Sequence, residues 1–194
     1  MRRREFIGNL IGTAVAWPIA ASAQQPVSKL YRIGMLETVS PALNAANLNA
    51  FRNGLKERGY VEAKDYVIEY RSADGVAERF PHFAAELVRL KVDVIVTRGT
   101  PATQAAKAAT ITVPVVMAAV GDPVGVGLVA SLARPGGNIT GFSLFYNELA
   151  GKRVELVKEL IQGSSRVALL YNMSNPVIPP QWEDTKRVAG ARSA

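Results

Sequence analysis

The stretch VDVIVTRGTPATQAAKAATITVPVVMAA, residues 92–119, decides the fold of this chain. Its two apolar runs, 92–97 and 113–119, lack the alternation of a half-exposed strand, and such runs are typical of strands buried on both faces of a sheet. The segment 101–109 between them is predicted to be a helix, and its opening proline suits the first helical position. The stretch therefore predicts a strand, a crossover helix and a second, parallel strand.

The same alternation of strands and helices continues on both sides of this unit. Leu48, Phe51 and Leu55 recur at spacings of three and four residues, so 45–58 is predicted to be a helix that stops at Gly59. The other elements expected in this part of the chain are strands at 31–36, 66–70 and 138–142 and helices at 76–90 and 124–132. The predicted fold class is α/β, with a parallel sheet flanked by helices.

After residue 142 the pattern starts again, with a helix at 148–160, an apolar strand at 166–171 and a helix from residue 179 onward. We therefore expect a first α/β lobe at 31–142 and the start of a second α/β lobe at 143–194. One parallel strand cannot form a sheet alone, because it needs neighbours to pair with. The second lobe is accordingly expected to be incomplete and the chain truncated.

The first 23 residues have the features of an export signal. Two arginines followed by one residue and two apolar ones match the twin-arginine pattern, and the apolar run at 7–20 behind them is too short to span a bilayer comfortably. The run closes on a small-x-small cleavage signature. The residues that carry these signals are Arg3, Arg4 and Phe6 for export and Ala21 and Ala23 for cleavage. We expect a signal peptide at 1–23, cleaved after Ala23, a linker at 24–30, and a periplasmic mature chain.

The charge of the chain does not indicate a nucleic-acid partner. Removing residues 1–23 takes away three arginines and one glutamate, which lowers the net charge from +7 to +5. The remaining charges form mixed groups such as Lys56-Glu57-Arg58, a pattern typical of solvated helix faces and not of a phosphate-binding stripe.

Residues that could support catalysis or hold a metal are few. The chain has no cysteine, which excludes disulfides, thiolate metal sites and a cysteine nucleophile. The one histidine, His82, lies between Phe80 and Phe83 in a predicted helix, where a partly buried packing role is expected. No pair of acidic residues is placed for general acid and base work. We therefore expect no enzyme activity, no metal and no cofactor.

The loops that follow the strands carry the candidate binding residues. In open parallel sheets, ligands bind beyond the carboxyl ends of the strands, near helix N-termini. The first loop offers the hydroxyls of Thr38 and Ser40, and the third offers Gly99, for close backbone approach, with Thr100 as a helix N-cap before Pro101. The fourth repeats this arrangement with Asp122 as the cap before Pro123. Hydroxyls and N–H groups suit a carboxylate, and Asp122 suits an ammonium, so the loops predict a small polar ligand.

One motif points to a different function. Residues 125–130, GVGLVA, fit the G-x-G-x-x-A pattern of dinucleotide-binding sites. The motif follows the fourth strand instead of opening the sheet, and no acidic residue ends a strand about 20 residues further on. An exported oxidoreductase with a dinucleotide-type α/β domain is therefore kept as the alternative. A regulatory ligand-sensing domain is a third possibility, disfavoured because no helix-turn-helix segment precedes residue 31.

Several of these segments together resemble the ABC transporter substrate-binding protein family that includes the tryptophan/tyrosine-type periplasmic binding proteins. The matching stretches occur in order along the chain: RREFIG at 3–8, ASAQQ at 21–25, FRNGL at 51–55, GYVE at 59–62, GTPA at 99–102, GDPV at 121–124 and RPGGNITG at 134–141. The resemblance is specific to the family and not to a ligand.

The resemblance implies a two-lobed, periplasmic-binding-protein-like fold that closes on a ligand and delivers it to ABC permease subunits. It implies ligand contacts in the loops of the first lobe and in a facing loop of the second. The residues expected to bind are Thr38, Val39, Ser40, Gly99, Thr100, Asp122, Asn172 and Asn175. The implied partners are a small polar solute, of the amino-acid-like or carboxylate-bearing class, and the permease, with no nucleic acid. The intact protein is expected to be a monomer. Family members run well beyond 300 residues, which again indicates a truncated second lobe.

Overall fold

The computed structural model describes residues 29–144, 149–163 and 166–190. The strands are β1 (Tyr31–Glu37), β2 (Tyr66–Ser72), β3 (Val94–Arg98), β4 (Val115–Gly121) and β5 (Ile139–Leu144). The helices are α1 (Ala45–Glu57), α2 (Phe80–Arg89), which a short 3-10 turn η1 (Ala77–Arg79) precedes, α3 (Thr100–Ala109), α4 (Ala150–Leu160) and α5 (Ile178–Gly190).

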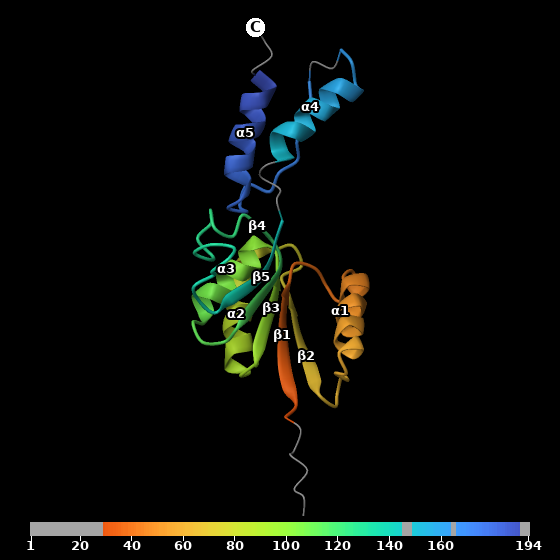
Figure 1. Ribbon diagram of the computed structural model, residues 1–194, viewed down its shortest axis with the longest axis vertical. Helices are drawn as coiled ribbons and strands as arrows, with labels where there is room; N and C mark the ends of the chain where they lie inside the picture. The colour runs from red at the N-terminus through yellow and green to blue at the C-terminus, as the bar shows by residue number, and fades with distance from the viewer. Residues whose placement is uncertain (1–28, 145–148, 164–165, 191–194) are drawn as a thin grey trace, which may run out of the picture.

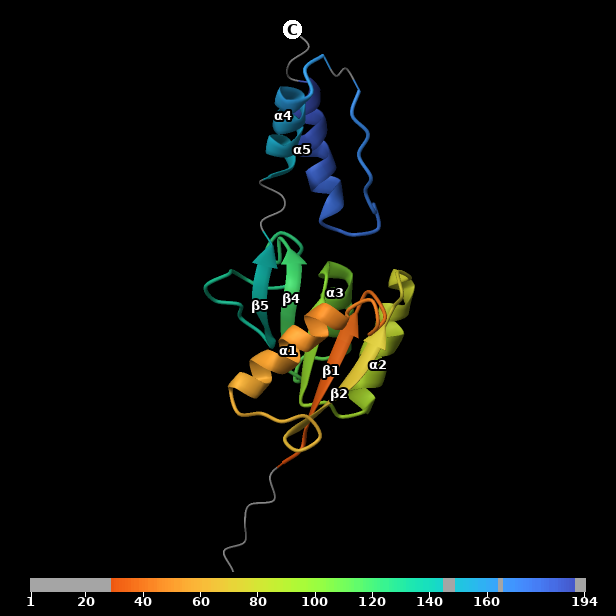
Figure 2. The ribbon, with the colours of Figure 1, turned by 90° about the vertical axis from the view of Figure 1, so that its right-hand side faces the viewer.

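The five strands form one parallel sheet in the order β2-β1-β3-β4-β5. Helix α1 covers one face, and α2 and α3 cover the other, as Figures 1 and 2 show together. The sheet is therefore the centre of a three-layer α/β arrangement, which confirms the predicted fold class. It also brings the carboxyl ends of all five strands to a single edge.

Each face of the sheet has its own apolar core. Side chains alternate along a strand, so Ile33 and Met35 of β1 point to the α1 face and pack with Leu48 of that helix. Leu36 points the other way and joins Leu87 of α2 in the larger core beneath α2 and α3. Continuous apolar sequence is required in the central strands because both of their faces are covered.

The elements predicted between residues 31 and 119 are all present, with ends shifted by a few residues. The helix predicted at 124–132 was wrong. This segment turns after about one helical turn, because Gly127 adopts φ +70° and the N–H of Leu128 donates to Pro123 O instead of continuing the helical ladder. Glycine is costly inside a helix, and two of them fall in this short segment.

The strand predicted at 166–171 was also wrong. The segment is extended but carries no ladder, since among the described residues no strand pairs with it. Leu170 is fully exposed. An apolar run of this kind becomes a strand only when neighbours supply its backbone hydrogen bonds, and the described part of the chain provides none.

Helices α4 and α5 lie side by side beyond the edge at which β4 and β5 end (Figures 1 and 2). Gly151 is the close-packing point, because a Cβ atom there would lie 2.8 Å from Val188 of α5. Val177, which directly precedes α5, lies close to the sheet. A Cβ atom placed on Gly121, at the end of β4, would be 3.3 Å from its side chain. The division of the chain into lobes at residue 142 stays a prediction, and the signal peptide lies outside the described residues.

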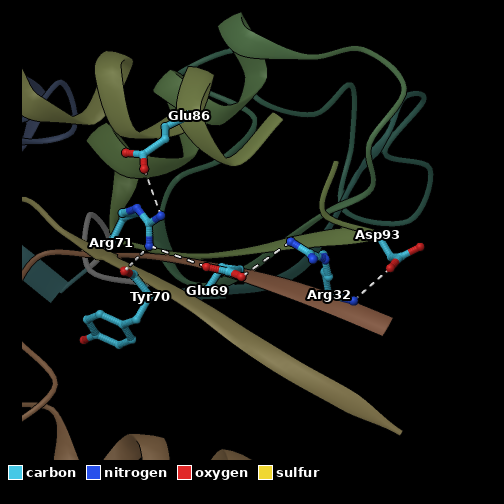
Figure 3. A network of polar contacts seen from close by, with 6 residues as sticks. All are labelled: Arg32, Glu69, Tyr70, Arg71, Glu86 and Asp93. Carbon is cyan, nitrogen blue, oxygen red and sulfur yellow. Dashed lines mark hydrogen bonds and ion pairs between the residues drawn. The ribbon is translucent and has the colours of Figure 1, made fainter. Parts of the chain in front are cut away.

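A network of charged side chains joins the edge strand β2 to its neighbours (Figure 3). Arg71 Nη2 donates to Glu86 Oε1 of α2 at 2.8 Å, and Glu69 lies 3.8 Å from Arg71 and 3.7 Å from Arg32 of β1. Asp93 accepts from the backbone N–H of Arg32 at 2.8 Å. The guanidinium of Arg71 lowers the pKa of the Glu86 carboxyl. These charged groups pair with one another on the α2 side of the sheet. We therefore infer a structural role for them, in attaching the edge strand β2 to β1 and α2.

The core of the sheet can be tested with two isoleucines that differ in burial. Ile95 of β3 has no exposed surface, whereas Ile111 is 87% exposed in the turn after α3. We expect Ile95→Ala to lower the free energy of unfolding by about 2–5 kcal/mol, because it removes buried methyl groups and leaves a cavity. Ile111→Ala should change it by less than about 0.5 kcal/mol. Urea denaturation followed by circular dichroism measures both, and equal effects would contradict the assignment of Ile95 to the core.

Candidate ligand-binding site

The strand order reverses between β1 and β3, which lie side by side although β2 comes between them in the chain. The chain leaves β1 toward α1 on one face, and it leaves β3 toward α3 on the other. The two connections therefore separate just beyond the strand ends. This separation creates a crevice, which is the general binding position in open α/β sheets.

A surface cleft of about 520 Å³ occupies this position. Its lining residues come from the β1–α1 connection and the first turn of α1, from the end of β3 and the N-cap of α3, and from the C-terminal parts of β4 and β5. The lining residues are Thr38, Val39, Leu43, Asn47, Arg98, Gly99, Ala119 and Leu144. The wall thus combines aliphatic side chains with a hydroxyl, an amide, one guanidinium and glycine backbone.

The loop after β1 reaches the cleft as predicted for two of its three candidates. Thr38 and Val39 line it, whereas Ser40 does not. The carbonyl of Ser40 instead accepts the N–H of Asn44 at 3.0 Å, and its hydroxyl lies 3.5 Å from the N–H of Leu43. Ser40 therefore shapes the turn that leads into α1.

The loop after β3 reaches the cleft through Gly99, which has φ +88° and is the N-cap of α3. The prediction that Thr100 is the N-cap was wrong, because the helix begins one residue earlier. Thr100 is its first residue, is 2% exposed and does not line the cleft. Thr103 Oγ1 donates to Gly99 O at 3.0 Å and lies 2.7 Å from Thr97 Oγ1. These contacts fix the turn between β3 and α3.

The carboxylate of Asp122 turns back onto its own loop. Its Oδ1 accepts the N–H of Gly125 at 2.9 Å, and the residue has a positive φ of 39°. Asp122 does not line the cleft beside Thr38 and Gly99. The cap-like role expected of Asp122 is therefore present, although the predicted helix behind it does not form.

The two asparagines expected in the second lobe lie in the turn before α5. Asn172 Oδ1 accepts the N–H of Ser174 at 3.1 Å, and Asn175 Oδ1 lies 3.4 Å from the N–H of Val177. Val177 packs on Gly121 at the end of β4, so this turn approaches the carboxyl edge of the sheet. Neither asparagine lines the cleft.

A polar cluster that the sequence reading missed lies under the cleft. Glu37 and Arg98 are the last α1-facing residues of β1 and β3, Tyr70 faces α1 from β2 beside Met35, and Asn44 lies just before α1. Arg98 Nη1 donates to Asn44 Oδ1 at 2.8 Å, Asn44 Nδ2 donates to Tyr70 Oη at 3.1 Å, and Tyr70 Oη donates to Val39 O at 2.8 Å. The sequence carried a signal for this cluster. Each of the three residues stands two positions after an apolar residue of its strand, so strand alternation places it on the same face as that residue.

Glu37 is the unusual member of this cluster. It is 3% exposed, and its Oε2 is the one buried side-chain polar atom without a hydrogen-bond partner among the described residues. Burial raises the pKa of the Glu37 carboxyl, and the positive charge of Arg98 opposes that shift. An ionised carboxylate at this position therefore lowers the free energy of unfolding relative to a neutral one.

Other predicted features have simple outcomes. His82 is exposed and not partly buried, and its ring contacts Phe83 edge-on at 5.6 Å between centroids. The G-x-G-x-x-A segment forms turns and opens no helix, so it lacks the N-terminus that binds a pyrophosphate. In the described ranges, no three His, Cys, Asp or Glu side chains gather into a possible metal site.

Comparison with known proteins agrees with the α/β fold described above. The sequence profile of the family described as "ABC transporter substrate binding protein" matches residues 32–192. A tyrosine-binding protein of Clostridioides difficile (strain R20291) is 35% identical over 147 residues, which are 75% of this chain and 42% of that protein. Those 147 residues are thus most of this chain and less than half of its relative.

Two solved structures match with similar extent. The ABC domain from Streptococcus pneumoniae in complex with L-Trp has a TM-score of 0.72 and 34% identity, and a conserved domain protein from Vibrio cholerae has 0.74 and 34%. Each match covers 84% of this chain and 54% of the solved one. This chain thus spans about half the length of these relatives. Within the described residues, no helix has the length and apolarity required to cross a bilayer.

The cost of burying Glu37 can be tested through the pH dependence of stability. A carboxyl whose pKa is raised on folding stabilises the fold below its unfolded pKa, and that stability is lost as pH rises through the folded pKa. Glu37→Gln mimics the neutral carboxyl. We therefore expect it to raise the free energy of unfolding at pH 7 by about 1 kcal/mol, with the gain disappearing near pH 4.

The matched control is Glu78→Gln, at an exposed glutamate, which should change stability by less than about 0.5 kcal/mol at both pH values. Urea titrations from pH 4 to pH 7 give the comparison. The same pH slope in Glu37→Gln and in the parent chain would show that Glu37 is not the group responsible.

Proposed function

This chain belongs to the ABC transporter substrate-binding protein family, and from that premise we propose that its cleft binds one side of an amino-acid-like solute. The single observation that carries the proposal is the position of the cleft, at the point where the strand order reverses between β1 and β3. The family consists of binding proteins and not of enzymes, in agreement with the expectation from sequence.

The chemistry of the cleft supports a ligand with both apolar and charged parts. Val39, Leu43 and Leu144 offer an aliphatic surface, whereas Thr38 and Arg98 offer a hydroxyl and a cation. An amino acid with a large side chain has this mixed character. The relatives named for tyrosine and solved with L-Trp support the same ligand class.

Of the predicted ligand residues, we assign Thr38, Val39 and Gly99 to the cleft wall. Ser40 and Thr100 shape the two loops that present them. Direct contacts from the remaining candidates, Asp122, Asn172 and Asn175, stay predictions.

We further propose that the ligand is captured outside the cytoplasm and handed to ABC permease subunits in the membrane. The twin-arginine motif and cleavage signature in residues 1–23 support export to the periplasm. Closure of a second lobe over the cleft, in a protein that acts as a monomer, would complete the site. The alternative of an exported oxidoreductase is not proposed, because the segment 125–130 on which it rested opens no helix.

Two glycines with the same backbone constraint provide a test of the cleft. Gly99 and Gly59 both have positive φ, +88° and +86°, so alanine at either position is strained by about 1–3 kcal/mol. Only at Gly99 would the new Cβ face the cleft wall, 3.7 Å from Thr38 Cγ2, whereas at Gly59, beyond the end of α1, it would meet nothing within 4 Å. We expect L-tyrosine or L-tryptophan to bind the parent chain, and Gly99→Ala to weaken binding about fivefold or more, since about 1 kcal/mol of distortion has that effect.

Titration calorimetry, or NMR where binding is weak, measures the two variants beside the parent chain. Gly59→Ala should bind like the parent and so controls for backbone strain in general. Equal weakening by both variants would remove the cleft from the proposal. Failure of the parent chain to bind any of a panel of amino acids would refute the proposed ligand class.

A further inference from the structure

Arg98 is the cation of the cleft wall, and its guanidinium is sparsely used. It ends β3 at the strand-order reversal and is half-buried. One hydrogen bond, from Nη1 to the neutral Asn44 amide, engages it, although a guanidinium has five N–H donors. In the described part of the chain, no carboxylate lies within ion-pair distance of Arg98.

The other arginines near the sheet show how different this is. Arg71 donates to Glu86 at 2.8 Å, and Arg52 donates to Glu62 at 2.7 Å through Nε and at 3.2 Å through Nη2. These guanidiniums have protein carboxylates as partners. Arg98 donates instead to the neutral amide of Asn44 and also lines the cleft. Its remaining N–H donors are therefore free for an anion that enters the cleft from solution.

A short chain of hydrogen bonds holds the guanidinium in place. Asn44 is 1% exposed, and its Oδ1 accepts from Arg98 and, at 2.8 Å, from Asn47 Nδ2. Its own Nδ2 donates to Tyr70, whose hydroxyl donates to Val39 O. Each donor in this chain has an acceptor, so Asn44 is oriented with its oxygen toward Arg98. Such positioning reduces the side-chain entropy that a long arginine would otherwise lose on binding.

The start of α3 strengthens the positive potential at this point. Gly99, the next residue, is the N-cap of α3, a ten-residue helix whose positive end adjoins the guanidinium. Glu37 ends the adjacent strand and its buried carboxyl is influenced by the charge of Arg98, but no ion pair joins the two side chains. A ligand anion would therefore not have to displace an ion-paired carboxylate of the described residues from Arg98.

We propose that Arg98 binds the carboxylate of the ligand, and that Asn44 and Tyr70 act as positioning residues for its guanidinium. The inference rests on the proposed function and narrows it, since it requires the ligand to carry a carboxylate that faces β3. A planar guanidinium can donate two parallel hydrogen bonds to a carboxylate, which gives direction as well as affinity.

The test compares three compounds that differ only in their charged groups: L-tyrosine, tyramine, which lacks the carboxylate, and 3-(4-hydroxyphenyl)propanoate, which lacks the ammonium. Each is titrated into the full chain, labelled with ¹⁵N, and followed by NMR. We expect the two carboxylates to bind at least about tenfold more tightly than tyramine. Arg98→Gln should weaken both carboxylates about 30-fold and leave tyramine unchanged, as expected for loss of one partner of a partly buried charge pair.

Arg89→Gln is the matched control, because it removes the same charge at an exposed position on α2, away from the cleft. It should leave all three affinities unchanged. Asn44→Ala tests positioning: loss of orientation lowers the ratio of L-tyrosine to tyramine affinity, whereas a merely structural defect lowers both affinities alike. Retained tyramine binding also shows that each variant is folded.

The possible results separate this inference from the function beneath it. Equal binding of tyramine and L-tyrosine to the parent chain, or a carboxylate preference that survives in Arg98→Gln, would overturn the role of Arg98 and leave the amino-acid-like ligand standing. No binding of any of the three compounds would contradict the proposed function and this inference together.

Discussion

The pairing of β1 with β3 is the constraint on which the rest of the structure depends. Their register sets Leu36 beside Thr97, and the next residues along the two strands are Glu37 and Arg98. Because β2 lies outside β1, the connections that follow β1 and β3 must leave on opposite faces of the sheet. The cleft exists because these connections separate, and its charged floor exists because the two strands end at the same level.

The same alternation that builds the core also builds the polar cluster above it. On the α1 face, Ile33 and Met35 are apolar, and the next position in that row is Glu37. On β3, Val96 is followed in the same way by Arg98. The change from apolar to polar at the carboxyl end concentrates hydrogen-bonding groups where a ligand can reach them, at the expense of one buried oxygen without a partner.

Sequence reasoning predicted the fold well where periodicity was strong, as in the buried runs that became β3 and β4 and the apolar stripe of α1. It failed where the outcome depended on partners or on one backbone angle. The run at 166–171 has a strand composition but no neighbour among the described residues, and Gly127 ended the helix expected after β4. Thr38, Val39 and Gly99 could be placed near the cleft because they lie in loops after strands, whereas the position of Arg98 in the cleft wall depends on which strand lies beside which.

The position of β5 has a consequence for handling the protein. Among the described residues it is an edge strand, so one side of its backbone has no strand partner there, and Phe142 within it is 74% exposed. An unpaired edge with an exposed aromatic side chain is a template onto which a strand from another copy can add. The described part of the chain thus has two segments prone to association with other copies: β5 and the exposed apolar run that contains Leu170. Association through these segments would increase with protein concentration, and a charged residue in place of Phe142 would oppose it.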